Sequence, residues 1–545
     1  MRKLLLSLFL LLGFTSYAQP TTWNYVFPLA DLNGVMDVAT GPDGNAYVTG
    51  RFTGALQLGS TLLTSAQPGP CLYIAKLSPG GQVLRLTKLE GATDVLPRSI
   101  AVDPAGNTYV TGSFSGTLTY NRGQQTTSLL ATPTNGTIFL LKCSPTGAVH
   151  WVQQADGSTD GAYRYCQGTA VAVDRAGNSY ISGEASGANI RFGALALGAH
   201  LRDGFLASYD RQGQLRWARV LTHLSPSFGT SRAGGVAVDE AGNAYLSGHS
   251  YSGFTMDGIT LPLPTDTDYL ARFDTRQGQL RWARSTPGNG GGQAIATDKK
   301  GDVYIGGTFA GTTTLGRFTL TSAGDADGYV ARYCPAGNAE WATGLGGTNY
   351  DVVSSLAVDP KTRTVFATGM TNYTSQATNQ TFMATLGANG GQLRRTELVS
   401  GPGTSSSGQL AVDAKGNAYA FGVFTGNCGF GSIALSTTAT QGYFGRFGHN
   451  LPGPTNTSNA LVAAEVSVFP VPAQQQFTVR LAGPDQARQA VLYDHQGHIV
   501  AERTIEPTSL LTEVGFDTAA LPDGLYVLRL VSPQATTTRL VTVQH

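Results

Sequence analysis

The stretch AVDPAGNTYVTG, Ala101–Gly112, decides the fold, because the chain contains seven versions of it. Each version has an alternating apolar run, a polar turn, a second alternating run with an aromatic residue, and a closing glycine. Apolar residues at every second position on either side of a Gly-Asn turn are typical of a β-hairpin. In chain order, repeats 1 to 7 begin with Val38–Gly50, Ala101–Gly112, Val171–Gly183, Val236–Gly248, Ile295–Gly307, Leu356–Gly369 and Leu410–Gly422.

The hairpins recur at a regular spacing. Between the turn glycines Gly44 and Gly416 lie six intervals that together cover 372 residues, a mean of 62. A period of this size indicates a repeat architecture in which each unit stacks on its neighbours.

Two further strands follow each hairpin. In repeat 4 the third strand is Tyr269–Asp274 and the fourth, after a glycine turn, is Gly278–Ser285. Four short antiparallel strands form one blade of a β-propeller. The sequence therefore predicts an all-β chain with a seven-bladed β-propeller over residues 19–450.

The two ends of this region complement one another. Repeat 7 stops near Gly448 without a fourth strand, whereas Thr22–Leu29 precedes the first hairpin and reads as an isolated fourth strand. We expect the N-terminal strand to complete the last blade, which removes an open sheet edge. The fourth-strand position is interpreted as the site of all five tryptophans, Trp23, Trp151, Trp217, Trp282 and Trp341.

The ends of the chain predict export. Met1–Ala18 has the basic head, apolar middle and small-residue cleavage site of a secretory signal peptide. Residues 451–463 are a linker rich in Pro, Asn, Ser and Thr, and residues 464–545 alternate as seven short strands. About eighty residues in seven strands are typical of a small β-sandwich.

Composition excludes several classes of partner. The chain has 36 basic and 35 acidic residues. Removal of Arg2 and Lys3 with the leader leaves a net charge near −1, so nothing attracts nucleic acid or an anionic membrane. No later stretch is apolar for about 18 residues, and no transmembrane segment is expected.

Five scattered cysteines predict no disulfide framework, with Cys143–Cys166 as the one pair that is conceivable.

Recurring acidic residues invite a metal or catalytic interpretation. One aspartate precedes each of six hairpin turns, where its side chain can cap the backbone turn, and we assign it a structural role. These residues are Asp103, Asp174, Asp239, Asp298, Asp359 and Asp413. Asp325-Ala326-Asp327-Gly328 hints at calcium but lacks the full twelve-residue ligand loop. The eight histidines form no metal motif, and no catalytic or nucleotide-binding motif is present. We therefore expect no cofactor and no enzymatic activity, with Ca²⁺ at Asp325–Gly328 as the one metal that stays possible.

The repeat resembles a bacterial β-propeller repeat family. The closest copy runs from Asp327–Arg332 through Trp341, Gly346-Gly347 and Asp351 to Leu356–Asp359. The resemblance covers nearly all of residues 22–448 and implies an interaction or surface module without a particular chemistry. Repeat 1 departs at Gly41, where the turn aspartate is missing. Repeat 6 departs at Lys361–Thr364, where the turn is longer, and both departures predict altered turns.

The last eighty residues resemble the type A sorting domain of the type IX secretion system of Bacteroidetes. The matching positions are Pro470, Pro472, Asp494, Gly497, Gly524, Tyr526 and Arg539. In that family Asn usually stands where this chain has Val471, and Arg where it has His498. The resemblance implies passage through the periplasm and across the outer membrane by the type IX machinery. The domain is then typically cleaved, and the cargo is released or anchored to surface lipopolysaccharide.

These observations favour a secreted or cell-surface β-propeller that binds a glycan or a surface protein. One alternative is a propeller hydrolase or lyase acting on polysaccharide, with its carboxylates around the central channel. A further alternative is a purely structural surface-layer or adhesive element.

Overall fold

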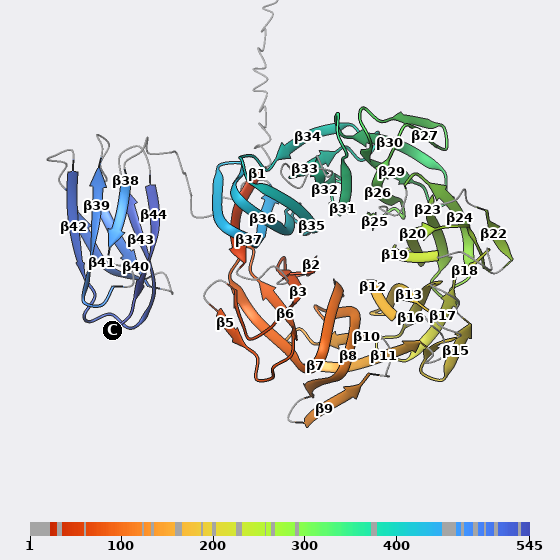
Figure 1. Cartoon of the computed structure of the whole chain (residues 1–545), viewed down its shortest axis with the longest axis horizontal. Helices are drawn as coiled ribbons and strands as arrows, with labels where there is room; N and C mark the ends of the chain where they lie inside the picture. Colours follow the sequence, from red (N-terminus) through yellow and green to blue (C-terminus); the bar gives the residue numbers. More distant parts are fainter. Residues whose placement is uncertain are drawn as a thin grey trace, which may run out of the picture. The chain divides into compact units, whose positions relative to one another are not determined.

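A computed structural model represents the whole chain (Figure 1). It describes residues 22–29, 35–58, 61–122, 125–131, 136–157, 166–186, 189–198, 203–224, 231–256, 258–262, 267–288, 294–371, 379–448, 465–469, 473–482, 489–494, 498–505, 511–531 and 536–545. The expected signal peptide and linker lie outside these residues. The chain divides into two compact units, Met1–His449 and Asn450–His545.

The described residues form 44 β-strands and no helix, which confirms the all-β prediction. Accordingly, the described part of the chain contains no helix with the length and apolarity needed to cross a membrane.

Each repeat begins with the predicted hairpin. Its first strand lies nearest the centre of the unit in Figure 1, and its second strand pairs antiparallel with it. The strand pairs are β2 (Asp37–Thr40) with β3 (Ala46–Phe52), β7 (Val83–Val102) with β8 (Thr108–Arg122), β12 (Cys166–Val173) with β13 (Ser179–Ala185), β19 (Ser231–Val238) with β20 (Asn243–Ser250), β25 (Ala294–Thr297) with β26 (Val303–Phe309), β31 (Val352–Val358) with β32 (Val365–Thr371), and β35 (Thr404–Val412) with β36 (Ala418–Phe430).

The third and fourth strands follow in the predicted order. The third strands are β6 (Cys71–Leu77), β10 (Thr137–Cys143), β16 (Asp203–Tyr209), β23 (Thr267–Asp274), β29 (Asp327–Tyr333), β33 (Gln380–Leu386) and β37 (Ile433–Gly448). In repeats 2 to 6 the fourth strands are β11 (Val149–Gly157), β17 (Leu215–Val220), β24 (Leu280–Thr286), β30 (Ala339–Leu345) and β34 (Leu393–Leu398). The first part of β7 is the fourth strand of repeat 1. Repeats 5 and 6 show the simple sheets β25-β26-β29-β30 and β31-β32-β33-β34.

An extra hairpin lies between the second and third strands of several repeats, which the prediction of four strands per repeat omitted. It is formed by β4 (Ala55–Leu58) and β5 (Thr61–Thr64), the end of β8 and β9 (Gln125–Leu130), β14 (Asn189–Phe192) and β15 (Leu195–Gly198), β21 (Phe254–Met256) and β22 (Ile259–Leu261), β27 (Thr312–Leu315) and β28 (Phe318–Thr321), and the end of β36 with the start of β37. The second strand of each extra hairpin is mostly exposed, whereas the first buries alternate apolar side chains, such as Leu56 and Leu58 in repeat 1 and Ile190 and Phe192 in repeat 3. Where these strands are separate elements they are only 3 to 6 residues long, so their alternation is too brief to distinguish them from loops in the sequence.

Strand β1 (Thr22–Leu29) lies in the same sheet as repeat 7. The sheet order is β1-β37-β36-β35, and β1 pairs antiparallel with β37 from Thr22 opposite Gly448 to Leu29 opposite Gly442. The predicted pairing of the N-terminal strand with the third strand of the last repeat is thus present in the structure.

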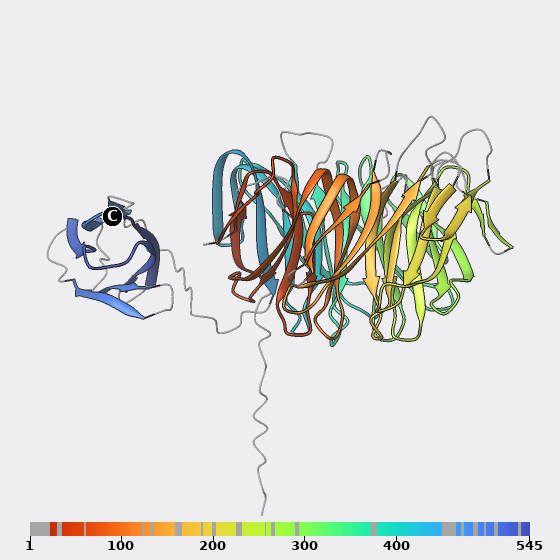
Figure 2. The ribbon, with the colours of Figure 1, turned by 90° about the horizontal axis from the view of Figure 1, so that it is seen from below.

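The first strands of the repeats contact one another in chain order. Strand β2 contacts β7, which contacts β12, and the series continues through β19, β25, β31 and β35. Strand β35 also contacts β2. Seen along the axis in Figure 1 these strands surround a centre, and seen from the side in Figure 2 the strands of this unit run across its thickness.

The core lies between neighbouring repeats rather than inside each sheet. One apolar cluster, for example, combines Tyr304 and Val330 of repeat 5 with Leu356 and Phe382 of repeat 6. Burial of each such side chain stabilises the fold by roughly 1.5–3 kcal/mol. No repeat can therefore hold its core without its neighbours.

The C-terminal unit has the seven predicted strands in two sheets. One sheet is β38 (Glu465–Phe469), β39 (Gln476–Ala482) and β42 (Leu511–Asp517). The other is β41 (Ile499–Thr504), β40 (Gln489–Tyr493), β43 (Gly524–Val531) and β44 (Thr536–Val543). Phe477 and Phe516 of the first sheet share one core with Leu492, Leu528 and Val541 of the second.

Candidate functional site

The recurring aspartates hold the hairpin turns. Asp103 Oδ1 accepts hydrogen bonds from the N–H groups of Ala105 and Asn107, at 2.9 and 2.8 Å. Its Oδ2 accepts from the Asn107 side chain and from the Tyr109 hydroxyl. Asp174, Asp239 and Asp413 accept from the corresponding groups of their own turns. These carboxylates are occupied inside each repeat, as a structural role requires.

Four tryptophans join neighbouring repeats. Trp217 Nε1 donates to the carbonyl of Thr275 in the next repeat, at 3.1 Å, and its ring lies against Gly278. Trp151, Trp282 and Trp341 donate to Arg211, Pro335 and Ala388 in the same way. Each ring also contacts the hairpin tyrosine of its own repeat, with centroids 6.0–6.2 Å apart.

Trp23 does not occupy this position, so that part of the interpretation is wrong. Tyr25 lies opposite Arg446, the position that Trp341 takes opposite Arg332, and both fourth strands have a bulge at this point. Trp23 instead packs edge-on against Phe430, Tyr443 and Phe447 in repeat 7. The other fourth strands have the same bulge, so Trp23 corresponds to Ala339 of repeat 5 and stands two residues before the tryptophan position. This register depends on strand pairing and cannot be seen in the sequence.

The two departures from the repeat have structural compensation. In repeat 1, Asp43 replaces the missing turn aspartate and accepts from Asn45 N–H and from the Tyr47 hydroxyl. Although burial opposes it, hydrogen bonds from Lys76 and Asn45 lower the pKa of Asp43 to about 2. The altered turn thus keeps its buried hydroxyl satisfied.

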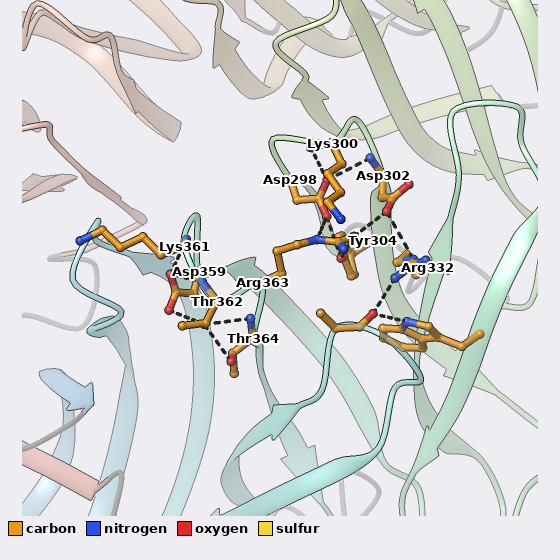
Figure 3. A network of polar contacts seen from close by, with 12 residues as sticks. Asp298, Lys300, Asp302, Tyr304, Arg332, Asp359, Lys361, Thr362, Arg363 and Thr364 are labelled. Carbon is orange, nitrogen blue, oxygen red and sulfur yellow. Dashed lines mark hydrogen bonds and ion pairs between the residues drawn. The ribbon is translucent and has the colours of Figure 1, made fainter. Parts of the chain in front are cut away.

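In repeat 6 the longer turn carries an arginine that reaches into repeat 5 (Figure 3). Arg363 has a φ of 59°, and its Nε donates to Asp298 Oδ2 at 2.6 Å. Its Nη2 donates to Asp302 Oδ2 at 2.5 Å. Repeat 5 has Asp302 where most other repeats have the turn asparagine, and burial together with nearby Asp298 raises its pKa. Repeat 6 thus has Arg363 where other repeats have the turn glycine, and repeat 5 has Asp302 where most have the turn asparagine. The two departures carry opposite charges and form an ion pair.

A central cavity of about 140 Å³ lies among the first strands of the repeats. Its described lining includes one carboxylate, Asp37, and one arginine, Arg98. Asp37 accepts hydrogen bonds from Ile100 N–H of the next repeat and from its neighbour Val38 N–H, both at 2.8 Å. Burial raises the pKa of Asp37 to about 7, although these hydrogen bonds and one with Ser99 act in the opposite direction.

A larger cleft of about 460 Å³ opens between repeats 5 and 6. Its lining combines hydroxyl and amide side chains with leucines on the outer strand β34, and contains one carboxylate, Asp351. The described lining residues are Gly344, Leu345, Gly346, Gly347, Thr348, Asn349, Asp351, Thr371, Gln380, Phe382, Ala384, Leu393, Thr396 and Leu398. Leu393 and Leu398 are 48% and 46% exposed. This size and mixture are typical of a ligand pocket.

Two buried His–Asp pairs lie in repeats 3 and 4. His223 Nδ1 is 2.7 Å from Asp203 Oδ1, and His249 Nδ1 is 3.0 Å from Asp268 Oδ1. The sheets that carry them are joined by a bridge between Asp203 and Ser231. The sequence analysis missed these pairs because their members are about twenty residues apart on different strands. The signal for the second pair was a histidine directly after the closing glycine, Gly248-His249, whereas His223 follows the fourth strand of its repeat.

The described residues contain no group of three or more His, Cys, Asp or Glu arranged to hold a metal ion. Asp325 of the partial calcium motif is exposed, whereas Asp327 is buried. All five cysteines are free, so Cys143 and Cys166 form no disulfide.

The sorting-motif residues lie mostly at strand ends of the C-terminal unit. The Tyr526 hydroxyl donates to the Pro522 carbonyl at 2.8 Å, and Gly524 begins β43. Asp494 accepts from His498 N–H across a turn, and Arg539 lies in β44. Pro470, Pro472 and Gly497 lie outside the described residues.

Residues 467–544 match the model of the secretion system C-terminal sorting domain family. The C-terminal unit is a secretion system C-terminal sorting domain. The sorting domain is of the type IX kind that the sequence indicated, and it marks the protein for export to the cell surface or the medium.

Among curated proteins, a WD repeat-containing protein of Acanthamoeba polyphaga mimivirus is 24% identical over 362 residues. The match covers 53% of this chain and about 25% of that relative's length. WD repeats form propeller blades, in agreement with the repeated four-stranded sheets seen here. The region before the sorting domain consists of β-propeller repeats.

Several solved structures have a similar course of the chain. The Dos1 propeller has a TM-score of 0.41 and 9% identity, covering 78% of this chain and 95% of that one. An ulvan lyase of a polysaccharide lyase family has a TM-score of 0.40 and 11% identity, covering 74% and 92%. Hydrazine synthase of Kuenenia stuttgartiensis has a TM-score of 0.39 and 12% identity, covering 75% and 96%. At these values no activity is transferred to this chain.

Proposed function

We propose that the protein is an exported seven-bladed β-propeller, closed by β1, that binds an uncharged glycan outside the cell. The cleft between repeats 5 and 6 is the binding site in this proposal. The type IX sorting domain delivers the propeller to the surface or the medium.

Contacts between the last and first repeats support the closed ring. Arg446 Nη1 lies 3.5 Å from the Pro79 carbonyl of repeat 1, the counterpart of the contact from Arg332 to Ala388 between repeats 5 and 6. Tyr25 and Phe27 lie against Gly81, as the tryptophans lie against the turn glycines elsewhere. The same kind of contact therefore joins repeat 7 to repeat 1.

The composition of the cleft carries the binding proposal. Its polar lining is made of hydroxyls, amides and one carboxylate, with no Lys, Arg or His among the described lining residues. Hydroxyl and amide groups exchange hydrogen bonds with sugar hydroxyls, and the leucines cover the apolar faces of the rings. A lining without cations favours a neutral polysaccharide over a sulfated or uronic acid one.

A glycan-array screen of the exported protein, followed by calorimetry, tests the binding proposal. Removing hydroxyls from the cleft in a Thr371→Ala/Thr396→Ala variant is expected to weaken binding about 5- to 100-fold. Thr312→Ala on the rim strand β27 is the control and should bind like the unaltered protein. Equal affinities for the two variants, or binding of anionic glycans alone, would contradict the proposed site.

Deletion of residues 450–545 tests the export proposal separately. The truncated propeller should accumulate in the periplasm, whereas the full chain reaches the surface or the medium. Cell fractionation with antibody to the propeller measures this. Surface delivery of the truncated chain would show that another signal directs export.

One observation favours the alternative, a polysaccharide hydrolase or lyase. A carboxylate that orients a histidine is a common arrangement for general-base catalysis, and His223 and His249 each have such a partner. Incubation with neutral and uronic acid polysaccharides, read as new reducing ends or unsaturated products, tests this function. Activity that is lost in His223→Gln or His249→Gln would establish it.

A further inference from the structure

Asp327 begins the third strand of repeat 5 and has an unsatisfied carboxylate oxygen. The residue is buried, with 5% of its surface exposed. Oδ2 accepts from Ala323 N–H at 3.0 Å, whereas Oδ1 has no hydrogen-bond partner in the described structure. A buried carboxylate with an open oxygen is costly unless a cation or donor neutralises it.

Repeat 3 shows how the same position finds a hydrogen-bond partner elsewhere. Asp203 occupies it there, and its Oδ1 pairs with His223. His223 stands six residues after Trp217, and the residue six after Trp341 in repeat 5 is Gly347. Repeat 5 therefore has the aspartate of this pair without its histidine.

A second buried carboxylate, that of Asp351, lies beside Gly347. Asp351 is 2% exposed, and its Oδ2 accepts from Gly347 N–H at 2.6 Å. Thr308 Oγ1 lies 3.3 Å from the Asp327 carbonyl and 3.0 Å from the Asp351 carbonyl, so the two aspartates lie close together. Asp327 Oδ1 faces Gly346, 2.7 Å from where a Cβ on that glycine would lie.

The backbone of two packed loops lies beside the open oxygen of Asp327. The loop Ser322–Gly328 packs against the loop Gly346–Asp351, with Gly324 in contact with the backbone of Thr348. Backbone carbonyls and carboxylates are the ligands of hard divalent cations, and Ca²⁺ accepts irregular sets of six to eight oxygens. No described Lys or Arg forms an ion pair with Asp327.

We propose that Asp327 and Asp351 bind one Ca²⁺ ion between these two loops of repeat 5. The ion takes the place of the histidine of repeat 3, and backbone carbonyls of the loops complete its coordination. It joins the segment before the third strand to the segment after the fourth, beside the cleft that Gly346, Gly347 and Asp351 line.

The test uses the exported full chain, stripped with EDTA and titrated with Ca²⁺ while its melting temperature is recorded. We expect the melting temperature to rise with half-saturation near about 0.1–1 mM, the range of extracellular calcium modules. Hydrogen exchange of the unaltered protein should slow in Ser322–Gly328 and Gly346–Asp351 when Ca²⁺ is added. No change in melting temperature, or protection elsewhere only, would overturn the proposal.

Three variants locate the site. Asp327→Asn should weaken Ca²⁺ binding more than tenfold, whereas Asp325→Asn, which alters the exposed carboxylate of the same loop, should leave it unchanged. Gly347→His should restore the pair of repeat 3 and make a folded protein whose melting temperature no longer responds to Ca²⁺. A Ca²⁺ response that persists undiminished in folded Asp327→Asn or Gly347→His protein would overturn the assignment.

Discussion

Individual polar residues of the propeller are largely used to join turns and neighbouring repeats. The turn aspartates could be assigned from sequence because an Asx-type cap depends only on local spacing. Arg363 could not, since its partners lie in another repeat, and the partner Lys76 of Asp43 lies in another strand. The His–Asp pairs were missed for the same reason.

Asp239 shows what one turn aspartate contributes. It is 6% exposed and accepts from Ala241 N–H and from both the backbone and the side chain of Asn243. Asp239→Ala leaves buried donors without an acceptor and should lower the free energy of unfolding by about 2–3 kcal/mol. Urea unfolding measures this. Asp94→Ala, which removes a 60% exposed carboxylate paired with Arg51, should cost less than about 1 kcal/mol. Equal losses would contradict the capping role.

Asp37 predicts a dependence of stability on pH. Its pKa is about 7 in the folded protein and about 3.9 in an unfolded chain, so the folded state binds the proton more tightly. The stability that it contributes is therefore complete below about pH 4 and declines as the pH rises to about 7. Asp37→Asn should remove this decline from the free energy of unfolding measured between pH 4 and 8.

Asp43 is the matched control, because its pKa shift has the opposite sign. With a pKa of about 2 in the folded protein, it stabilises above about pH 4 and loses this effect at lower pH. Asp43→Asn should leave the decline in the free energy of unfolding between about pH 4 and 7 intact. Below about pH 4 it should reduce the loss of stability that the unaltered protein shows. A decline that survives in Asp37→Asn would show that another group causes it.

At the scale of single elements, bulges in the first strands explain the closing glycines. The first strand of repeat 4 has a register shift between Ala233 and Val236, and a Cβ on Gly248 would lie 2.1 Å from the Arg232 carbonyl oxygen. Repeats 2, 3, 6 and 7 have the same close approach at Gly112, Gly183, Gly369 and Gly422. The hairpins were predictable from their alternation, whereas the bulges depend on pairing that the sequence does not reveal.

Gly248→Ala is expected to be severely destabilising. The added Cβ meets a backbone oxygen that cannot move without disturbing the strand pair, so we expect a loss of more than about 2 kcal/mol in urea unfolding. Gly198→Ala at the end of β15 is the control, because nothing lies within 4 Å of the added Cβ. That variant should be neutral or slightly more stable. A neutral Gly248→Ala would contradict the close approach.

At the scale of the whole molecule, strand β1 ties the beginning of the propeller to its last repeat. Its position could be predicted because a missing strand at one end matched an extra strand at the other. The detailed position of Trp23 could not, because Trp23 and Tyr25 are both aromatic and only the strand pairing shows that Tyr25 has the tryptophan position. Strand β1 therefore packs on side chains at least 407 residues away along the chain, as in the contact of Trp23 with Phe430, Tyr443 and Phe447.

Deletion of Thr22–Leu29 tests this dependence. The deletion exposes the edge of β37 and removes the buried Trp23, so the propeller should melt at a lower temperature and associate through the open edge. Calorimetry and light scattering measure both effects. A synthetic peptide with the sequence of Thr22–Leu29, added to the deleted chain, should restore the melting temperature and the monomer. The same peptide with Trp23→Ala should not, because it leaves a cavity beside Phe447. An unchanged melting temperature after the deletion would show that the ring closes without β1.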